Sequence, residues 1–221
     1  MFPSGTAVLL PLFIRTTVSA LSGETFTEGV SGLWCGFIEG FGVLPGVRGE
    51  IEGFRGMTMH FTIRDMRDDD WERVSQIYEQ ALQEGISTFA TVCPTFEEWD
   101  KAHLKDCRYV MLADDTVIGW CAVSPTSSRE AYKGVVEVSI YFDKAFRGLG
   151  LGTKLLDHLC RESEAKGYWC LFVNILLINT ASINLHKKCG FREVGYRERI
   201  AKDLFGVWQN TVVMERRNGI S

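Results

Sequence analysis

One stretch near the middle of the chain constrains the fold more than any other. Residues 135–142 are rich in β-branched and aromatic types, which predicts a strand. Residues 151–166 carry apolar side chains at helical spacing, which predicts a helix with one buried face. Between them, Arg147-Gly148-Leu149-Gly150-Leu151-Gly152 supplies a tight turn. Because loop amides and the positive end of the helix dipole would point at one spot, this arrangement predicts a site for a phosphate-bearing ligand.

The spacing of this loop separates it from two common glycine-rich motifs. A nucleotide P-loop ends in Gly-Lys-Ser/Thr, whereas here the order is Gly152-Thr153-Lys154. A dinucleotide fingerprint has wider glycine spacing and an acidic residue about 20 positions on, and none closes the next predicted strand, residues 169–174. The remaining pattern, Arg-x-x-Gly-x-Gly, resembles the pyrophosphate loop of the GNAT N-acetyltransferases. The alternative is a helix that is merely entered through a glycine turn.

A second signature lies downstream. Residues 179–191 resemble the GNAT helix that opens with Asn and ends in Gly-Phe, where Asn179 would cap the helix and Gly190 would stop it. Residues 87–91, 129–132, 136–141, 182–186 and 206–208 further resemble the phosphinothricin acetyltransferase branch. The resemblance runs from about residue 61 to 216. It implies an α/β GNAT fold, in which a mixed central sheet with a splayed strand pair is flanked by helices.

Hydrophobic periodicity predicts the other elements of this domain. We expect a first strand at residues 61–64, followed by a helix that carries Trp71, Val74, Tyr78, Ala81 and Leu82 on one face. A capping box at residues 95–98 starts a short helix toward residue 105. A hairpin joins residues 109–113 to 117–124, and later strands follow at 169–176, 192–200 and 211–215.

Residues 1–58 differ from the rest, because they hold 11 of the 22 glycines and no lysine. They show no strong helix or strand period. We therefore predict a glycine-rich N-terminal extension, disordered or not native, before a GNAT domain at residues 59–217. A genuine glycine-rich accessory segment is the alternative. The apolar run at residues 7–14 is far shorter than the roughly 20 residues of a membrane span, so no membrane partner is expected.

Composition excludes several other function classes. The net charge of -4 argues against nucleic acid as the main partner. Seven scattered cysteines without a CxxC pair indicate reduced, mostly buried thiols in a cytoplasmic protein. The four histidines are dispersed as well, so we expect no metal, and His60, His103 and His158 are predicted to lie at the surface.

Two residues are candidates for proton transfer. Glu137 lies between Val136 and Val138 and matches the acidic position of the branch motif; partial desolvation would raise its pKa and make it a better base. His186 occupies the slot in which the branch carries a histidine, and an imidazole titrates near neutrality, so it would donate or relay a proton. The alternatives are a solvent-facing Glu137 and a His186 that only packs.

The resemblance also implies which residues bind the substrates. Acetyl-CoA would be the co-substrate, held by the backbone of Ile140 and Phe142 and by a pyrophosphate loop. The loop residues are Arg147, Gly148, Gly150, Gly152 and Thr153, and Asn179 and Ser182 would reach the pantetheine end. Phe89, Arg129 and Tyr132 fall in loops over the acceptor, where Arg129 would pair with a carboxylate. We expect a homodimer that acts on a small-molecule amine.

One departure from the branch bears on the acceptor. The branch often reads Lys-x-Gly-x-Trp-His-Asp, whereas residues 204–210 here are Leu-Phe-Gly-Val-Trp-Gln-Asn. That puts the phosphinate herbicide itself in doubt. We expect an N-acetyltransferase for the α-amine of a small amino acid or analogue of the phosphinothricin, methionine sulfoximine or methionine sulfone type. A protein N-terminus or another cellular amine is the alternative acceptor, and a non-catalytic coenzyme A-binding module is a third possibility.

Overall fold

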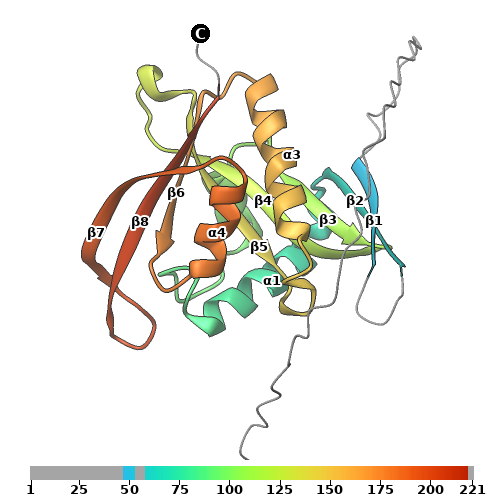
Figure 1. Cartoon of the computed structure of the whole chain (residues 1–221), viewed down its shortest axis with the longest axis horizontal. Helices are drawn as coiled ribbons and strands as arrows, with labels where there is room; N and C mark the ends of the chain where they lie inside the picture. Colours follow the sequence, from blue (N-terminus) through green and yellow to red (C-terminus); the bar gives the residue numbers. More distant parts are fainter. Residues whose placement is uncertain (1–46, 53–57, 219–221) are drawn as a thin grey trace, which may run out of the picture. The chain divides into compact units, whose positions relative to one another are not determined.

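The computed structural model describes residues 47–52 and 58–218, in which eight strands form one mixed sheet. The strand order is β1-β2-β3-β4-β5-β6-β8-β7, and every neighbouring pair is antiparallel except β5 and β6 (Figure 1). The strands are β1 (Val47–Glu52), β2 (Thr58–Asp65), β3 (Tyr109–Ala113), β4 (Thr116–Pro125), β5 (Val135–Phe142), β6 (Cys170–Leu176), β7 (Arg192–Lys202) and β8 (Trp208–Arg217). The predicted GNAT fold class is confirmed.

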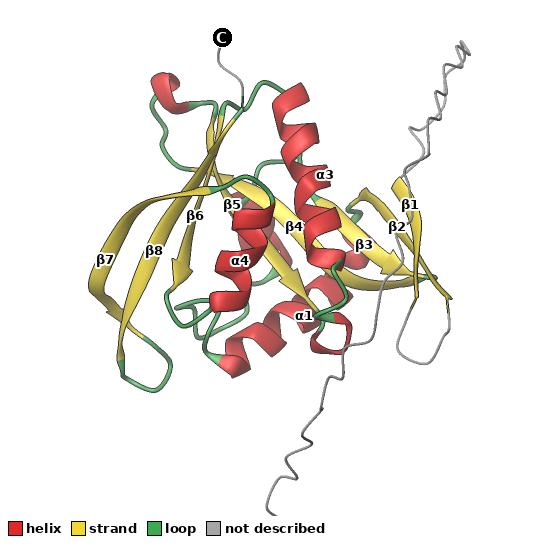
Figure 2. Ribbon diagram, viewed as in Figure 1, coloured by secondary structure: helices red, strands yellow, loops and turns green. Residues whose placement is uncertain are grey.

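Helices cover both faces of the sheet (Figure 2). The helices are α1 (Trp71–Glu84), α2 (Phe96–Ala102), α3 (Leu151–Ala165) and α4 (Thr180–Lys188). Leu155, Leu156 and Leu159 of α3 are buried in a cluster with β4, β5 and β6 side chains. Val74 and Ile77 of α1 pack instead with Trp99 and Trp120. Helices α1 and α3 thus each bury one apolar stripe, as their sequence periods predict.

Local signals in the sequence place the helix ends. Thr95 Oγ1 accepts a hydrogen bond from the Glu98 N–H, and the Glu98 carboxylate accepts one from the Thr95 N–H, so the predicted capping box starts α2. Gly85 has a φ of 67° and ends α1, and Gly190 has a φ of 83° just after α4. The expected elements between residues 61 and 215 are present, with ends shifted by a few residues.

The N-terminal part of the sheet differs from expectation. β1 lies inside the predicted extension, where we expected no strand, and it pairs with β2 from Val47 opposite Ile63 to Glu52 opposite Thr58. Gly49 faces Phe61, whose ring lies 2.2 Å from where a Cβ on Gly49 would be, so a side chain there would displace the ring. Residues 1–46 of the predicted extension lie outside the described residues.

Two histidines are also placed differently from expectation. His103 and His158 are half-buried rather than at the surface. His103 stacks on Trp99 with ring centroids 4.4 Å apart, and His158 meets Tyr109 edge-on at 4.5 Å. Burial lowers the pKa of both imidazoles below the ordinary value. The aromatic partners explain the difference, because each ring covers apolar surface that the local sequence does not reveal.

The splayed strand pair lies at the centre of the sheet. β5 and β6 pair only from Val135 opposite Cys170 to Glu137 opposite Phe172, and then they diverge. On its other side β5 stays paired with β4 as far as Phe142. The Asp143 N–H bonds to the Ile118 carbonyl, and antiparallel alternation therefore turns the backbone of Val138, Ile140 and Phe142 away from β4. The amide groups of Ile140 and Phe142 lie beyond the last β5–β6 pair and face the open wedge.

Candidate active site

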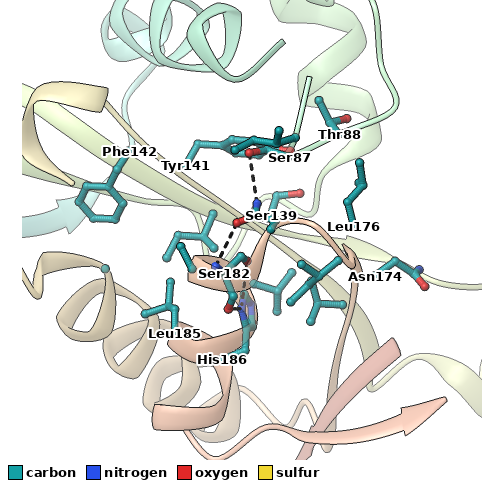
Figure 3. A pocket seen from close by; sticks show the side chains of 18 of the residues that line it. Ser87, Thr88, Ser139, Tyr141, Phe142, Asn174, Leu176, Ser182, Leu185 and His186 are labelled. Carbon is teal, nitrogen blue, oxygen red and sulfur yellow. Dashed lines mark hydrogen bonds between the residues drawn. The ribbon is translucent and has the colours of Figure 1, made fainter. Parts of the chain in front are cut away.

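A cavity of about 970 Å³ fills this wedge. Because side chains alternate along β5, its two ends lie on opposite faces of the sheet. Val138, Ile140 and Phe142 pack toward α3 and α4, whereas Tyr141 packs toward α1 and shares its face with Glu137. Figure 3 shows Ser182, Leu185 and His186 projecting from α4, across the cavity from Ser87 and Thr88. We call the end on the face of Ile140 and Phe142 the glycine-loop end, and the end on the face of Glu137 and Tyr141 the acceptor end.

The glycine loop, residues 147–152, forms part of the cavity wall at the glycine-loop end. Gly148 and Gly150 have φ values of 81° and 76°, and nothing lies within 4 Å of a Cβ added at either position. These left-handed conformations favour glycine, and they leave the loop open in front of α3. Gly152 differs, because its added Cβ would meet Leu185 at 3.3 Å, so it also lets α3 and α4 approach closely. Thr153 lines the cavity beside it.

Helix α1 fixes the position of this loop. Arg147 donates from Nε to the Phe142 carbonyl at 2.9 Å and from Nη1 to Glu84 at 2.6 Å. Just before it, Asp143 accepts hydrogen bonds from Arg73, Gln80 and the Ala145 N–H. Burial opposes ionisation of Asp143, but the three donors outweigh it and hold its pKa below the ordinary value. The loop is therefore held in place before any ligand binds.

Asn179 connects α4 to the loop that follows α1. Its Oδ1 accepts from the Ser182 N–H at 3.1 Å, which caps the helix. Its Nδ2 donates to Ser87 Oγ at 3.3 Å, across 92 residues of sequence. The dashed lines between Ser87 and Ser182 in Figure 3 follow these two bonds. Asn179 and Ser182 both line the cavity, as do Ile140 and Phe142.

His186 is almost completely buried, with 1% of its surface exposed. Its Nδ1 lies 2.8 Å from the Ser182 carbonyl, which can only accept, so Nδ1 carries the proton. Nε2 then presents a lone pair, and it has no hydrogen-bond partner among the described residues. Burial lowers the pKa of His186 below 6.5, although the bond to Ser182 acts in the opposite direction. The imidazole is therefore neutral near pH 7.

Glu137 lies at the acceptor end, at the last paired position of β5 and β6. It is half-buried, and the Asn174 Nδ2 donates to its Oε1 at 3.3 Å. Since a carboxylate only accepts, this contact fixes the orientation of the Asn174 amide. The carboxylate is thus held beside the open backbone edge of β5. In this position the carboxylate can take a proton from a nucleophile that approaches the β5 edge.

The predicted acceptor residues separate into two groups. Phe89 lines the cavity, in the loop between α1 and α2. Arg129 precedes the short turn at residues 130–132 and Tyr132 ends it; both are exposed, Tyr132 by 47%. The structure does not bring them to the cavity wall.

Sequence reasoning missed several lining residues. Aromatic side chains from α1, α2, β4 and β5 form one wall, and they are Tyr78, Trp99, Trp120 and Tyr141. Asn174, Arg197 and Thr211 come from β6, β7 and β8. Helical spacing predicts Tyr78 only as a core residue. Tyr141 lies in a stretch that resembles the branch but is not among the predicted site residues, and no local motif marks the others. Their shared location depends on strand pairing between distant segments.

Two further findings apply to residues 47–52 and 58–218 alone. No group of three or more His, Cys, Asp or Glu side chains there has the arrangement of a metal site. None of the helices in this range has the length and apolar character needed to cross a membrane.

Comparison with known proteins identifies the family. Residues 63–191 match the family described as "Acetyltransferase (GNAT) family". The chain belongs to the GNAT family of acetyltransferases. It is 31% identical over 161 residues to a phosphinothricin N-acetyltransferase from Alcaligenes faecalis, covering 70% of this chain and 81% of that protein. It is 27% identical over 163 residues to an L-methionine sulfoximine/L-methionine sulfone acetyltransferase from Pseudomonas paraeruginosa, covering 71% and 94%.

A solved structure of a GNAT relative bears on the co-substrate. The phosphinothricin acetyltransferase from Sinorhizobium meliloti, determined in complex with acetyl-CoA, is similar with a TM-score of 0.67 and 28% identity, over 72% of this chain and 89% of that one. The glycine-loop end fits such a ligand, because it combines an open loop, a helix N-terminus and unpaired β5 amides. This chain is therefore a GNAT acetyltransferase whose glycine-loop end has the form of a site for such a ligand.

Proposed function

We propose that this GNAT enzyme acetylates the α-amine of a small amino acid or analogue, of the phosphinothricin, methionine sulfoximine or methionine sulfone type. The observation that carries the proposal is the acceptor end of the cavity, where aromatic side chains form one wall of a space beside Glu137. A walled space of this kind suits a small molecule better than an extended peptide. The acceptors named for the two curated relatives are of this size.

Glu137 is the proposed general base. An amino acid arrives as an ammonium ion, and its nitrogen must lose a proton before it can attack the thioester carbon. Glu137 takes this proton, the freed lone pair of the nitrogen then forms the C–N bond, and the C–S bond breaks with coenzyme A leaving as its thiolate. Asn174 holds the carboxylate in place through its 3.3 Å hydrogen bond.

Backbone amides of β5 are the proposed donors to the carbonyl oxygen. The amides of Ile140 and Phe142 lie beyond the last β5–β6 pair and face the wedge, and the Phe142 carbonyl is already bonded to Arg147. A preorganised N–H beside the thioester stabilises the negative charge that develops on its oxygen. The same edge pairs with the pantetheine arm as an added strand would.

The proposed pyrophosphate contacts near that edge are Arg147, Gly148, Gly150, Gly152 and Thr153. The proposed contacts to pantetheine are Asn179 and Ser182. All seven line the glycine-loop end of the cavity. His186 is proposed as a proton relay, which its neutral imidazole and free Nε2 favour over the acid role.

An acceptor screen tests the function. Purified enzyme is mixed with acetyl-CoA and a panel of free amino acids and analogues, and thiol release is followed with mass detection of the acetylated product. We expect turnover of at least one small amino acid analogue well above spontaneous acetylation. Turnover restricted to peptides with a free N-terminus would favour the alternative acceptor class. Binding of acetyl-CoA without turnover of any acceptor would support the non-catalytic module.

We also propose a cytoplasmic homodimer and a catalytic domain that begins near residue 59. Exposed apolar side chains on β7, β8 and the turn between them support self-association: Val194, Tyr196, Ile200, Leu204, Phe205, Val207 and Trp208. The free thiols of Cys107, Cys121 and Cys160, all buried, support a reducing compartment. Sedimentation at several concentrations tests the dimer.

A further inference from the structure

Strands β7 and β8 bring an arginine to the acceptor end. Arg197 is directly opposite Thr211, and Thr211 is directly opposite Leu176 of β6. Side chains at paired positions project from the same face of a sheet, so these three share the face of Asn174 and Glu137. All five line the same cavity. Arg197 on β7 and Glu137 on β5 therefore line the acceptor end from different strands of the same sheet face.

The guanidinium of Arg197 is free to bind a ligand. Within residues 58–218 no carboxylate oxygen lies within 4.0 Å of it, and it makes no hydrogen bond to another side chain there. By contrast, Arg147 at the glycine loop is already bonded to Glu84 at 2.6 Å. An unpaired arginine beside a cavity is suited to bidentate binding of a carboxylate.

A bulge in β7 sets the course of the strand beside the cavity. Four steps along β7, from Arg197 to Ala201, match two steps along β8, from Thr211 to Gln209. Arg199 sits in this bulge with a φ of 47°, and its N–H donates to Asn210 Oδ1 at 2.8 Å. Bulges of this kind bend a strand and redirect its side chains. Asn210, one of the residues at which this chain departs from the branch motif, thus bonds to the bulge next to Arg197.

Thr211 gives a second, independent indication of a ligand. Its side chain is 2% exposed, and Oγ1 has no hydrogen-bond partner in the described part of the chain. A buried hydroxyl without a partner is costly, and native proteins rarely leave one unsatisfied. The hydroxyl proton can rotate toward an acceptor placed next to Arg197. The pair therefore offers one charged and one neutral donor to the same group.

We propose that Arg197, with Thr211, binds the α-carboxylate of the acceptor, while Glu137 faces its ammonium group. This inference rests on the proposed function and deepens it, because it makes the two charged groups of an α-amino acid the basis of selection. An amine that lacks the carboxylate leaves Arg197 unpaired. A peptide N-terminus, whose carboxyl group has become an amide, does the same.

The test compares an acid with its amide. Methionine sulfone and methionine sulfone carboxamide are assayed with wild-type enzyme and with Arg197→Gln, Arg197→Lys and Arg199→Gln. Loss of a charge-assisted bidentate contact should raise the KM for the acid about 10- to 100-fold in Arg197→Gln. The KM for the carboxamide and that for acetyl-CoA should change less than about twofold. Arg197→Lys should be intermediate, since it keeps the charge without the fork.

Arg199→Gln removes the same charge two residues away, outside the cavity wall, and should behave as wild type. Equal losses for acid and carboxamide in Arg197→Gln would overturn the inference, because they would indicate a structural defect. An unchanged preference for the acid would overturn it too, and another group would then bind the carboxylate. If the wild-type enzyme acetylates neither compound nor any amino acid in the screen, the proposed function fails instead.

Discussion

The two ends of the cavity are built from different kinds of structure. The glycine-loop end uses two continuous segments: residues 135–153 hold a strand, the glycine loop and the start of α3, and residues 179–186 hold the start of α4. The acceptor end collects side chains from α1, α2, β5, β6, β7 and β8. Consecutive residues specify the first end, whereas the second exists only once distant strands have paired. The ends should therefore respond separately to substitution.

Glu137→Gln should give the largest separation between the two ends. The amide keeps the shape of the side chain and loses the base, so kcat should fall about 10²- to 10⁴-fold. Affinity for acetyl-CoA, measured by calorimetry, should stay the same because the glycine loop is untouched. Glu164→Gln, at an exposed position of α3, is the matched control and should leave both quantities unchanged. Near-normal turnover of Glu137→Gln from pH 6 to 9 would rule out the base.

The same contrast explains what the sequence could predict. Gly148, Gly150 and Asn179 lie at the turn and cap positions that their residue types favour, so local patterns were enough to locate them. Arg129 lies in a motif, but position in a motif does not reveal which way a loop turns, and Arg129 does not line the cavity. Arg197 carries no motif. Only the β7–β8 register and the bulge after it place it beside Thr211.

The pH dependence of kcat tests whether His186 acts as a neutral proton relay. In His186→Asn, the side-chain amide can still donate to the Ser182 carbonyl, but the Nε2 lone pair is lost. If the neutral imidazole relays a proton, the wild-type kcat should be about ten times that of His186→Asn, and this ratio should stay constant above pH 6.5. Because burial lowers the pKa of His186 below 6.5, this ratio should decline only at lower pH.

An imidazolium acid predicts the opposite trend for His186. The charged form would be scarce at pH 7.5, so the ratio would be near one there and would rise as the pH falls. The kcat values of both enzymes from pH 5 to 8.5 decide between these outcomes. His186→Gln, which places an amide nearer the Nε2 position, serves as the control for packing.

Gly150→Ala should affect the glycine-loop end alone. A residue with a Cβ at a φ of 76° costs about 1–2 kcal/mol, and the loop would relax away from its ligand-binding shape. The KM for acetyl-CoA should rise about tenfold while the KM for the acceptor stays within about twofold. Gly167→Ala introduces similar strain after α3, where φ is 86°, and should lower the unfolding temperature without changing either KM. Equal kinetic effects in both variants would show that strain acts through overall stability.

Removal of residues 1–58 should have the smallest effect on catalysis. Among residues 47–52 and 58–218, the first that lines the cavity is Tyr78, and β1 contacts the sheet through β2. A chain that begins at Met59 should therefore keep kcat and both KM values within about twofold. It should unfold at a lower urea concentration than a chain that begins at Gly46, because only the longer one keeps β1 and the packing of Gly49 against Phe61. Loss of turnover in the shorter chain alone would assign β1 a part in the working enzyme, and loss in both would assign one to residues 1–45.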